Sequence, residues 1–285
     1  MIACYNLFMD IPKRRLGKTG VDVTILGLGG EGVLRTFGYE KEADALINRA
    51  IDLGINYFES ARAYSGSESY YGAALKGRRK DIFLTSKSHA RDKKGALAHL
   101  HETLRNMKTD HLDLWQVHDV RTGEDMDEIF GPGGAYEAFA EAKEKGLAGF
   151  IGVTGHHDPS IIRKCIEQYE FDTVLMPVNP AEPHYRSFIK EVMPVAQALR
   201  MGIIGMKVYC RGFAAKLPWF DSFEPFYRFA LSQQISTAVI GCDDIRQLEE
   251  NARFAGSFTP MQEQEMKELT EAVAPYARRL MYYKP

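Results

Sequence analysis

The sequence predicts an α/β fold: a (β/α)8 TIM barrel with an N-terminal β-hairpin and a C-terminal extra helix. The chain has 285 residues, close to the roughly 250 that such barrels typically contain. Eight short apolar runs alternate strictly with eight amphipathic runs, which indicates parallel strands joined by helical crossovers. Polar residues stand where several apolar runs end. We therefore expect residues 1–285 to form one barrel domain.

The predicted elements follow one another without a linker. Residues Arg14–Val23 are expected to form the hairpin, with Lys18–Gly20 as its turn, and Met1–Arg15 is interpreted as an arm leading into it. The predicted strands are Thr24–Gly29, Ile55–Glu59, Ile82–Lys87, Leu112–Val117, Phe150–Val153, Thr173–Val178, Ile203–Lys207 and Thr237–Ile240. The predicted helices are Lys41–Leu53, Glu68–Lys76, Lys93–Met107, Ala135–Lys145, Ser160–Gln168, Ser187–Leu199, Phe223–Gln233 and Ile245–Phe254. Met261–Arg279 is expected to form the extra helix.

Local signals support these boundaries. Gly54 and Gly146 follow two predicted helices, where glycine commonly caps a C-terminus. Asp158 and Pro159 open the fifth helix, since proline is well tolerated in a first turn. Eight βα units favour closure into a barrel over an open doubly wound sheet.

Composition excludes several classes of function. The formal net charge is -2 and no basic stripe occurs, which argues against a nucleic-acid partner. No apolar run reaches the roughly 18 residues of a membrane span. The four cysteines are scattered without a Cys-x-x-Cys pair, which favours free thiols in a reducing compartment over a zinc or iron–sulfur site. They are Cys4, Cys165, Cys210 and Cys242. We expect a cytoplasmic protein, and a homo-oligomer is compatible with the sequence.

Four polar residues lie at or just after the ends of predicted strands: Glu59, Tyr64, Lys87 and His118. The C-terminal ends of barrel strands open onto one face, so these side chains should meet in one pocket. A tyrosine has an ordinary pKa of about 10. A neighbouring lysine favours the phenolate, so we expect the pKa of Tyr64 to be lowered toward neutrality.

Ordered motifs along the chain resemble the aldo-keto reductases over nearly the whole length. They are Arg15–Gly20, Gly54–Tyr64, Thr85–Lys87, Asp113–His118, Gly152–His156 and Leu248–Asn251. The resemblance implies an α/β barrel that uses a nicotinamide cofactor, usually the phosphorylated form, without metal. We therefore expect NADP(H), with NAD(H) as the alternative.

The resemblance also implies roles for the strand-end residues. Tyr64 would donate a proton to the substrate carbonyl, Lys87 would lie beside it, and Glu59 would pair with Lys87. His118 would orient the carbonyl; the alternative is a buried histidine of the core. Two positions depart from the family pattern: Glu59 replaces an aspartate, and Leu175 replaces a glutamine that holds the nicotinamide amide.

The expected cofactor-binding residues follow the fifth to eighth strands, and barrels often bind phosphate after the last two. They are Thr154, Gly155, Asn179, Met206, Lys207, Gly241, Cys242, Asp243, Gln247, Glu250 and Asn251. Gln247 stands where the family often has an arginine for the 2′-phosphate. Asp243 and Asp244 are equally consistent with simple capping of the helix. The adjacent His156 and His157 point opposite ways on an extended segment, so no metal site is expected.

The sequence therefore predicts a nicotinamide-dependent oxidoreductase that reduces an aldehyde or ketone to an alcohol, with a small carbonyl compound as its partner. Two alternatives stay open. Glu59 and Leu175 are also compatible with a cofactor-binding sensor or accessory protein that has little or no reductase chemistry. Lys87 is also compatible with the Schiff-base lysine of an aldolase, although that hypothesis does not explain Tyr64 and Glu59.

Overall fold

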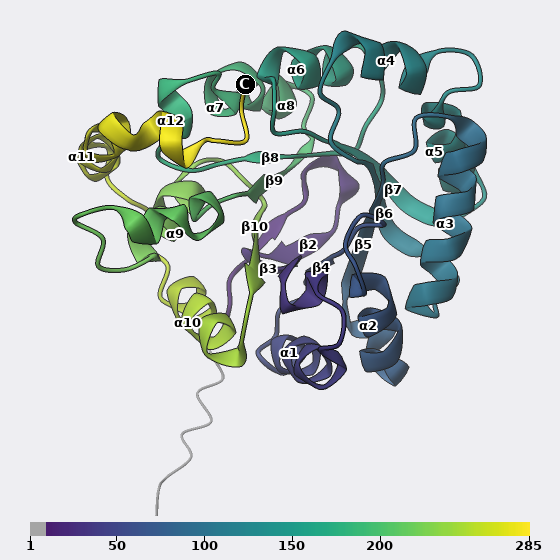
Figure 1. The fold of residues 1–285 in the computed structure, drawn as a ribbon, viewed down its shortest axis with the longest axis horizontal. Coiled ribbons are helices and arrows are strands. Elements are labelled where there is room, and N and C mark those ends of the chain that lie inside the picture. Colours follow the sequence, from purple (N-terminus) through teal and green to yellow (C-terminus); the bar gives the residue numbers. More distant parts are fainter. Residues whose placement is uncertain (1–9) are drawn as a thin grey trace, which may run out of the picture.

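The computed structural model describes residues 10–285, so residues 1–9 of the predicted arm, Cys4 among them, lie outside the described residues. Eight parallel strands close into a barrel in the order β10-β3-β4-β5-β6-β7-β8-β9. Figure 1 shows the strands at the centre and the helices around them. The strands are β3 (Leu26–Gly32), β4 (Tyr57–Glu59), β5 (Phe83–Ser88), β6 (Leu112–Val117), β7 (Ala148–Thr154), β8 (Thr173–Pro177), β9 (Gly202–Met206) and β10 (Thr237–Cys242). The predicted barrel is confirmed.

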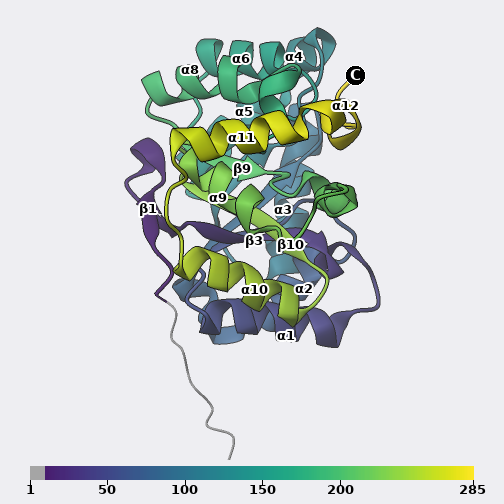
Figure 2. The ribbon, with the colours of Figure 1, turned by 90° about the vertical axis from the view of Figure 1, so that its left-hand side faces the viewer.

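The predicted hairpin is also present. Strands β1 (Lys13–Arg15) and β2 (Asp22–Thr24) pair antiparallel, and Gly20 takes a left-handed φ of 78° in the turn between them. Leu16 and Val23 are fully buried in the cluster that fills the barrel interior. The hairpin therefore closes the bottom of the barrel, opposite the C-terminal ends of the strands. Figure 2 shows β1 on the outer side of the molecule.

The helices agree with the sequence in most places. They are α1 (Glu40–Asp52), α2 (Ser67–Ala74), α3 (Lys93–Met107), α4 (Gly123–Phe130), α5 (Ala135–Glu144), α6 (Pro159–Gln168), α7 (Phe188–Glu191), α8 (Met193–Ala198), α9 (Glu224–Ser232), α10 (Ile245–Gly256), α11 (Glu263–Val273) and α12 (Ala277–Leu280). None of them is long and apolar enough to cross a membrane.

Three predicted boundaries need correction. The first barrel strand begins at Leu26, because Thr24 belongs to the hairpin strand β2. The helix predicted at Ser187–Leu199 is two short helices, since Pro194 opens the second of them and cannot donate a backbone hydrogen bond. The helix predicted over Met261–Arg279 is likewise interrupted, and a 3-10 turn at Ala274–Tyr276 separates α11 from α12.

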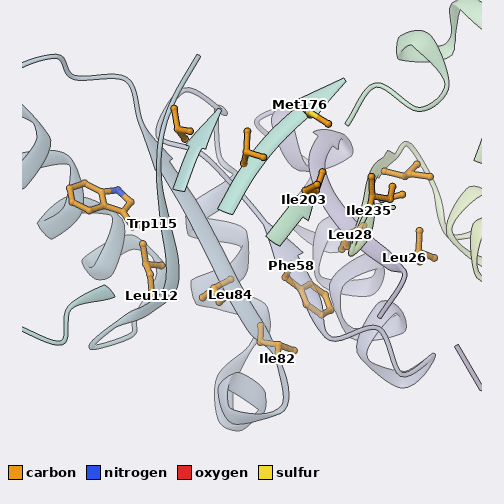
Figure 3. Close-up of a cluster of buried hydrophobic side chains, with 14 of the residues drawn as sticks. Leu26, Leu28, Phe58, Ile82, Leu84, Leu112, Trp115, Met176, Ile203 and Ile235 are labelled. Carbon is orange, nitrogen blue, oxygen red and sulfur yellow. The ribbon is translucent and has the colours of Figure 1, made fainter. Parts of the chain in front are cut away.

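Buried hydrophobic side chains fill the layer between the barrel and its helices. Figure 3 shows residues of this layer, Leu28, Phe58 and Trp115 among them, extending from the strands. Trp115 stacks on Phe139 of α5 with ring centres 3.7 Å apart. Burying side chains of this size supplies about 1.5–3 kcal/mol each, so this layer holds the strand ends in fixed positions.

The glycines of β3 serve packing. Gly27, Gly29 and Gly32 have the spacing of a dinucleotide-binding fingerprint, but they lie within a strand and not in a turn that opens a helix. A Cβ on Gly27 would lie 2.8 Å from a ring carbon of Tyr57 inside the barrel. The glycines of β3 therefore leave space for side chains inside the barrel and let the neighbouring strand backbone approach closely.

Candidate active site

The four strand-end residues lie together at the C-terminal mouth of the barrel. Glu59 is the last residue of β4, Lys87 lies near the end of β5, and His118 follows β6. Tyr64 lies in the loop between β4 and α2. Its ring centre is 4.8 Å from Lys87 Nζ and 5.9 Å from the ring centre of His118, with the two rings nearly perpendicular.

Glu59 and Lys87 form a buried ion pair. Lys87 Nζ lies 2.9 Å from Glu59 Oε1 and donates a second hydrogen bond of 2.9 Å to the carbonyl of Ser60. Burial acts to lower the pKa of Lys87, but Glu59 and Tyr64 outweigh it and the pKa is raised above its ordinary value. Lys87 is therefore an ammonium ion at neutral pH, and the longer side chain of Glu59 reaches it.

The pKa of Tyr64 differs from the expectation. Burial raises this pKa above its ordinary value, and Glu59 and Glu31 act in the same direction. Lys87 lowers the pKa as expected, but its effect is smaller than that of burial. The prediction of a pKa lowered toward neutrality was therefore wrong for the protein alone. The hydroxyl of Tyr64 carries its proton throughout the neutral range.

Gly30 explains how the ring of Tyr64 is held. A Cβ at this position would lie 2.7 Å from Tyr64 Cδ2 and 2.8 Å from the backbone oxygen of Glu59. Both distances are too short for a side chain. Glycine in β3 therefore lets the ring lie against the strand backbone, beside the Glu59–Lys87 pair.

His118 is a neutral imidazole. Burial is the main cause that lowers its pKa well below the ordinary value, and the charge of Lys87 adds to it. Its Nδ1 is buried and contacts no hydrogen-bond partner within residues 10–285. A neutral ring keeps one N–H to donate, so His118 can hydrogen-bond an oxygen placed near Tyr64.

The residues predicted to hold the nicotinamide amide are mostly engaged within the protein. Thr154 Oγ1 accepts a hydrogen bond of 2.8 Å from the backbone of Asp119, which leaves its hydroxyl proton to donate. Asn179 Nδ2 donates to the carbonyl of Lys207 at 3.1 Å, and its Oδ1 accepts from Ala181 at 3.0 Å. Gly155 is required for packing, since a Cβ there would lie 2.4 Å from Ile162 Cδ1.

Lys207 follows β9 with a left-handed φ of 55°, a strained conformation for a residue other than glycine. Its ammonium lies 5.0 Å from the ring centre of Tyr283 and makes no hydrogen bond or ion pair within residues 10–285. Burial lowers the pKa of Lys207 to about 8, partly offset by the charge of Glu31. A partly buried cation without an anionic partner among the described residues is the electrostatic condition for binding a phosphate.

The far end of the predicted cofactor site lies around the start of α10. Asp244 caps this helix by accepting from Gln247 N at 2.9 Å, and Gln247 Oε1 accepts from Asp243 N at 2.9 Å. Asn251 Oδ1 accepts from the hydroxyl of Tyr209 at 2.6 Å, and its Nδ2 donates to Cys242 Sγ at 3.5 Å. The capping interpretation of the acidic pair is therefore confirmed for Asp244.

The remaining predicted residues lie nearby on β9, β10 and α10. Met206 ends β9 and is partly exposed at the mouth, and Gly241 lies in β10 with no room for a Cβ beside Glu31. Glu250 Oε1 lies 3.9 Å from Arg253 Nη2. Together with the preceding groups, these residues form a path from the strand ends to the start of α10.

The sequence did not indicate a C-terminal segment that contacts this path. The ring of Tyr283 is 5.7 Å from that of His156, and its hydroxyl donates to Glu182 Oε1 at 3.1 Å. Lys284 Nζ forms an ion pair of 2.6 Å with the same carboxylate, and both side chains are fully buried. A lysine near the end of a chain carries no signal of burial, so only the fold reveals this contact.

The adjacent histidines do not form a metal cluster. His156 Nε2 lies 3.2 Å from Asp119 Oδ1, and burial lowers its pKa to about 3. Within residues 10–285, no group of three or more histidine, cysteine, aspartate or glutamate side chains is arranged to hold a metal ion.

Comparison with known proteins places this geometry in a family. A sequence model described as the Aldo/keto reductase family matches residues 25–217. The chain is 30% identical over 179 residues to the uncharacterized oxidoreductase YqkF of Bacillus subtilis, covering 58% of this chain and 55% of that protein. It is 31% identical over 159 residues to L-galactose dehydrogenase of Arabidopsis thaliana, covering 51% and 49%. The matched segments thus span about half the length of these relatives.

Solved structures show the same fold. The holo form of the aldo-keto reductase AKR11C1 from Bacillus halodurans superposes with a TM-score of 0.78 at 23% identity, covering 92% of this chain and 96% of that one. The family match covers well over half of the chain and includes all four strand-end residues. The chain therefore belongs to the aldo-keto reductase family.

Proposed function

We propose that this protein is an NAD(P)H-dependent oxidoreductase that reduces an aldehyde or ketone to an alcohol, with Tyr64 as the proton donor. The observation that carries the proposal is the buried Lys87–Glu59 pair of 2.9 Å beside the ring of Tyr64, with His118 on another side. The family match covers this segment.

Each of the four side chains has a chemical task in this reaction. Tyr64, protonated at neutral pH, gives its proton to the carbonyl oxygen. Lys87 stabilises the phenolate that Tyr64 becomes, because a cation 4.8 Å from the ring favours that negative charge. Glu59 keeps the ammonium of Lys87 in place. His118, being neutral, donates a hydrogen bond that orients the carbonyl oxygen.

The residues at the mouth fit a nicotinamide dinucleotide. When bound, the reduced cofactor supplies a hydride to the carbonyl carbon. Lys207 would hold its phosphate groups, since its ammonium has no acceptor among the described residues. The hydroxyl of Thr154 would face the nicotinamide amide in place of the glutamine that Leu175 replaces. Gln247 cannot clamp a 2′-phosphate as an arginine does, so we expect NADP(H) to be preferred over NAD(H) only slightly.

The two alternative functions, a Schiff-base aldolase and a cofactor-binding sensor, would require a different arrangement of these side chains. An aldolase needs a neutral lysine, whereas the partners of Lys87 raise its pKa. A sensor that binds cofactor without chemistry does not need a tyrosine, a lysine and a histidine grouped at the strand ends. The geometry therefore favours the reductase.

The proposal is tested by titrating the purified protein with NADPH and NADH and then assaying a broad panel of aldehydes and ketones. We expect binding of both dinucleotides, reduction of at least one carbonyl compound, and no effect of a chelator. Binding without turnover across the panel would favour the sensor, and absence of binding would contradict the proposal.

Cofactor affinity is expected to fall as the pH rises through about 8. Lys207 has a pKa of about 8, so it is charged below this pH and neutral above it. Only the charged form attracts the phosphates of the cofactor. Fluorescence titrations between pH 6.5 and 9.5 should therefore show weakening affinity, by up to about tenfold per pH unit. The Lys207→Met variant should bind more weakly and lose this pH dependence, and an unchanged pH profile in that variant would refute the role.

A further inference from the structure

Arg35 lies against the ring of the proposed proton donor. It is the last residue of the short 3-10 helix Val33–Arg35, which follows β3. Its guanidinium carbon is 5.1 Å from the ring centre of Tyr64. A carbonyl group that receives a proton from Tyr64 must lie beside the hydroxyl of this ring. A second group of the same substrate, a few atoms away, would therefore come within reach of Arg35.

One edge of this guanidinium is available for a ligand. Arg35 Nη1 donates to Glu31 Oε1 at 2.7 Å. Its Nε and Nη2 donate to no acceptor within residues 10–285, and the side chain is 42% exposed. Two parallel N–H groups on one edge match the two oxygens of a carboxylate and bind it bidentately.

The charges around Arg35 also favour an anion. Arg35 and Arg211 lie close enough to Lys207 to lower its pKa, and the carboxylates that raise this pKa are Glu31 and Asp119. Glu31 is shared between Arg35 and Arg211, the latter at 3.6 Å. Asp119 is already paired with another arginine at 2.6 Å. Positive charge therefore exceeds negative charge at this mouth, which attracts an anionic ligand.

Stability alone does not explain the position of Arg35. An exposed ion pair contributes only about 0.2–1 kcal/mol. A pair with the same sequence spacing, Arg163–Glu167 at 2.8 Å, lies within helix α6, outside the barrel. The distinguishing feature of Arg35 is its contact with Tyr64.

We propose that the substrate carries a carboxylate a few atoms away from its carbonyl group and that Arg35 binds this carboxylate. The inference rests on the proposed function, because Tyr64 fixes where the carbonyl lies. Lys207, on the other side of the mouth, is left for the phosphates of the cofactor. The substrate class is thus a short oxo acid or an aldehyde acid, and Arg35 determines the specificity for it.

The test compares p-carboxybenzaldehyde with its methyl ester, which has the same ring and aldehyde but no charge. The quantity measured is the ratio of kcat/KM for the acid to kcat/KM for the ester. We expect Arg35→Gln to lower this ratio by about tenfold or more, the effect of one lost charge-assisted contact. Glu31→Gln should raise the ratio, because it frees Arg35 and removes a competing carboxylate. Arg163→Gln is the matched control and should leave the ratio unchanged.

A ratio that is the same in the wild type and Arg35→Gln would overturn the inference while leaving the proposed reaction intact. If the wild type reduced neither of these aldehydes nor any other carbonyl compound of the panel, the proposed reaction would fail instead. In that case the role of Arg35 is tested without turnover, by calorimetric measurement of the affinity for p-(hydroxymethyl)benzoate, the alcohol that would be formed from the acid. Binding to the wild type that is weakened about tenfold in Arg35→Gln supports the site. Equal binding, or none to the wild type, overturns it.

Discussion

Replacing Tyr64 by phenylalanine is expected to lower turnover by at least about a hundredfold, which is typical of a lost general acid. The substitution removes the proton that Tyr64 would give to the carbonyl oxygen but keeps the ring. The contacts of that ring with Lys87, Arg35 and Gly30 stay in place, so cofactor affinity should change little. Stopped-flow measurement of cofactor fluorescence and absorbance gives both quantities.

Tyr136→Phe is a matched control for this experiment. Its hydroxyl donates to the carbonyl of Glu170 at 3.1 Å on the outside of the barrel, so its loss should not affect turnover. Equal single-turnover rates for the wild type and Tyr64→Phe would show that another group donates the proton.

The Lys284→Met variant is expected to be much less stable to unfolding than the wild type. Lys284 and Glu182 form a fully buried ion pair of 2.6 Å, and burial opposes the charge of each partner. Removing the lysine leaves a buried carboxylate without its cation, which costs about 3–5 kcal/mol. Thermal unfolding should show a melting temperature lower by roughly 10 °C.

Two further variants identify the cause of this loss. Lys267→Met removes an exposed pair with Glu271 at 3.9 Å and should cost less than about 0.5 kcal/mol. Combining Lys284→Met with Glu182→Gln should recover part of the stability, because the unpaired charge is gone. A melting temperature of Lys284→Met within 2 °C of the wild type, a difference below about 1 kcal/mol, would mean that the pair is not held as described.

The sequence predicts the barrel well because its two periodicities are local. Each strand is a short apolar run and each long helix repeats its apolar face, so both can be found without knowledge of their neighbours. The missed helix α4 (Gly123–Phe130) lies in a long loop and buries only Ile129, which leaves little periodic signal. Its capping box of Thr122 and Asp125 could have indicated it.

The sequence predicts which four polar residues lie together in the candidate site, but not the direction in which the pKa of Tyr64 is shifted. Glu59, Tyr64, Lys87 and His118 could be placed together because strand ends share one face. The direction of the Tyr64 pKa could not, because it depends on how far burial outweighs the charge of Lys87. The position of Arg35 follows from the 3-10 helix Val33–Arg35, which is too short to show a sequence periodicity. The engagement of Asn179 with the backbone of Lys207 is a tertiary contact of the same kind.

The pairing of Glu182 with Lys284 has a consequence for how the protein is made. The two halves of this contact are about a hundred residues apart, since Tyr283 reaches the same carboxylate across 101 positions. During synthesis, the barrel strands leave the ribosome well before residues 283 and 284. Until residues 283 and 284 have been synthesised, the carboxylate of Glu182 has no cation to pair with when it is buried. The ring of Tyr283 is also missing from its position beside His156. The cation that compensates Glu182 is therefore supplied only after every strand of the barrel has been synthesised.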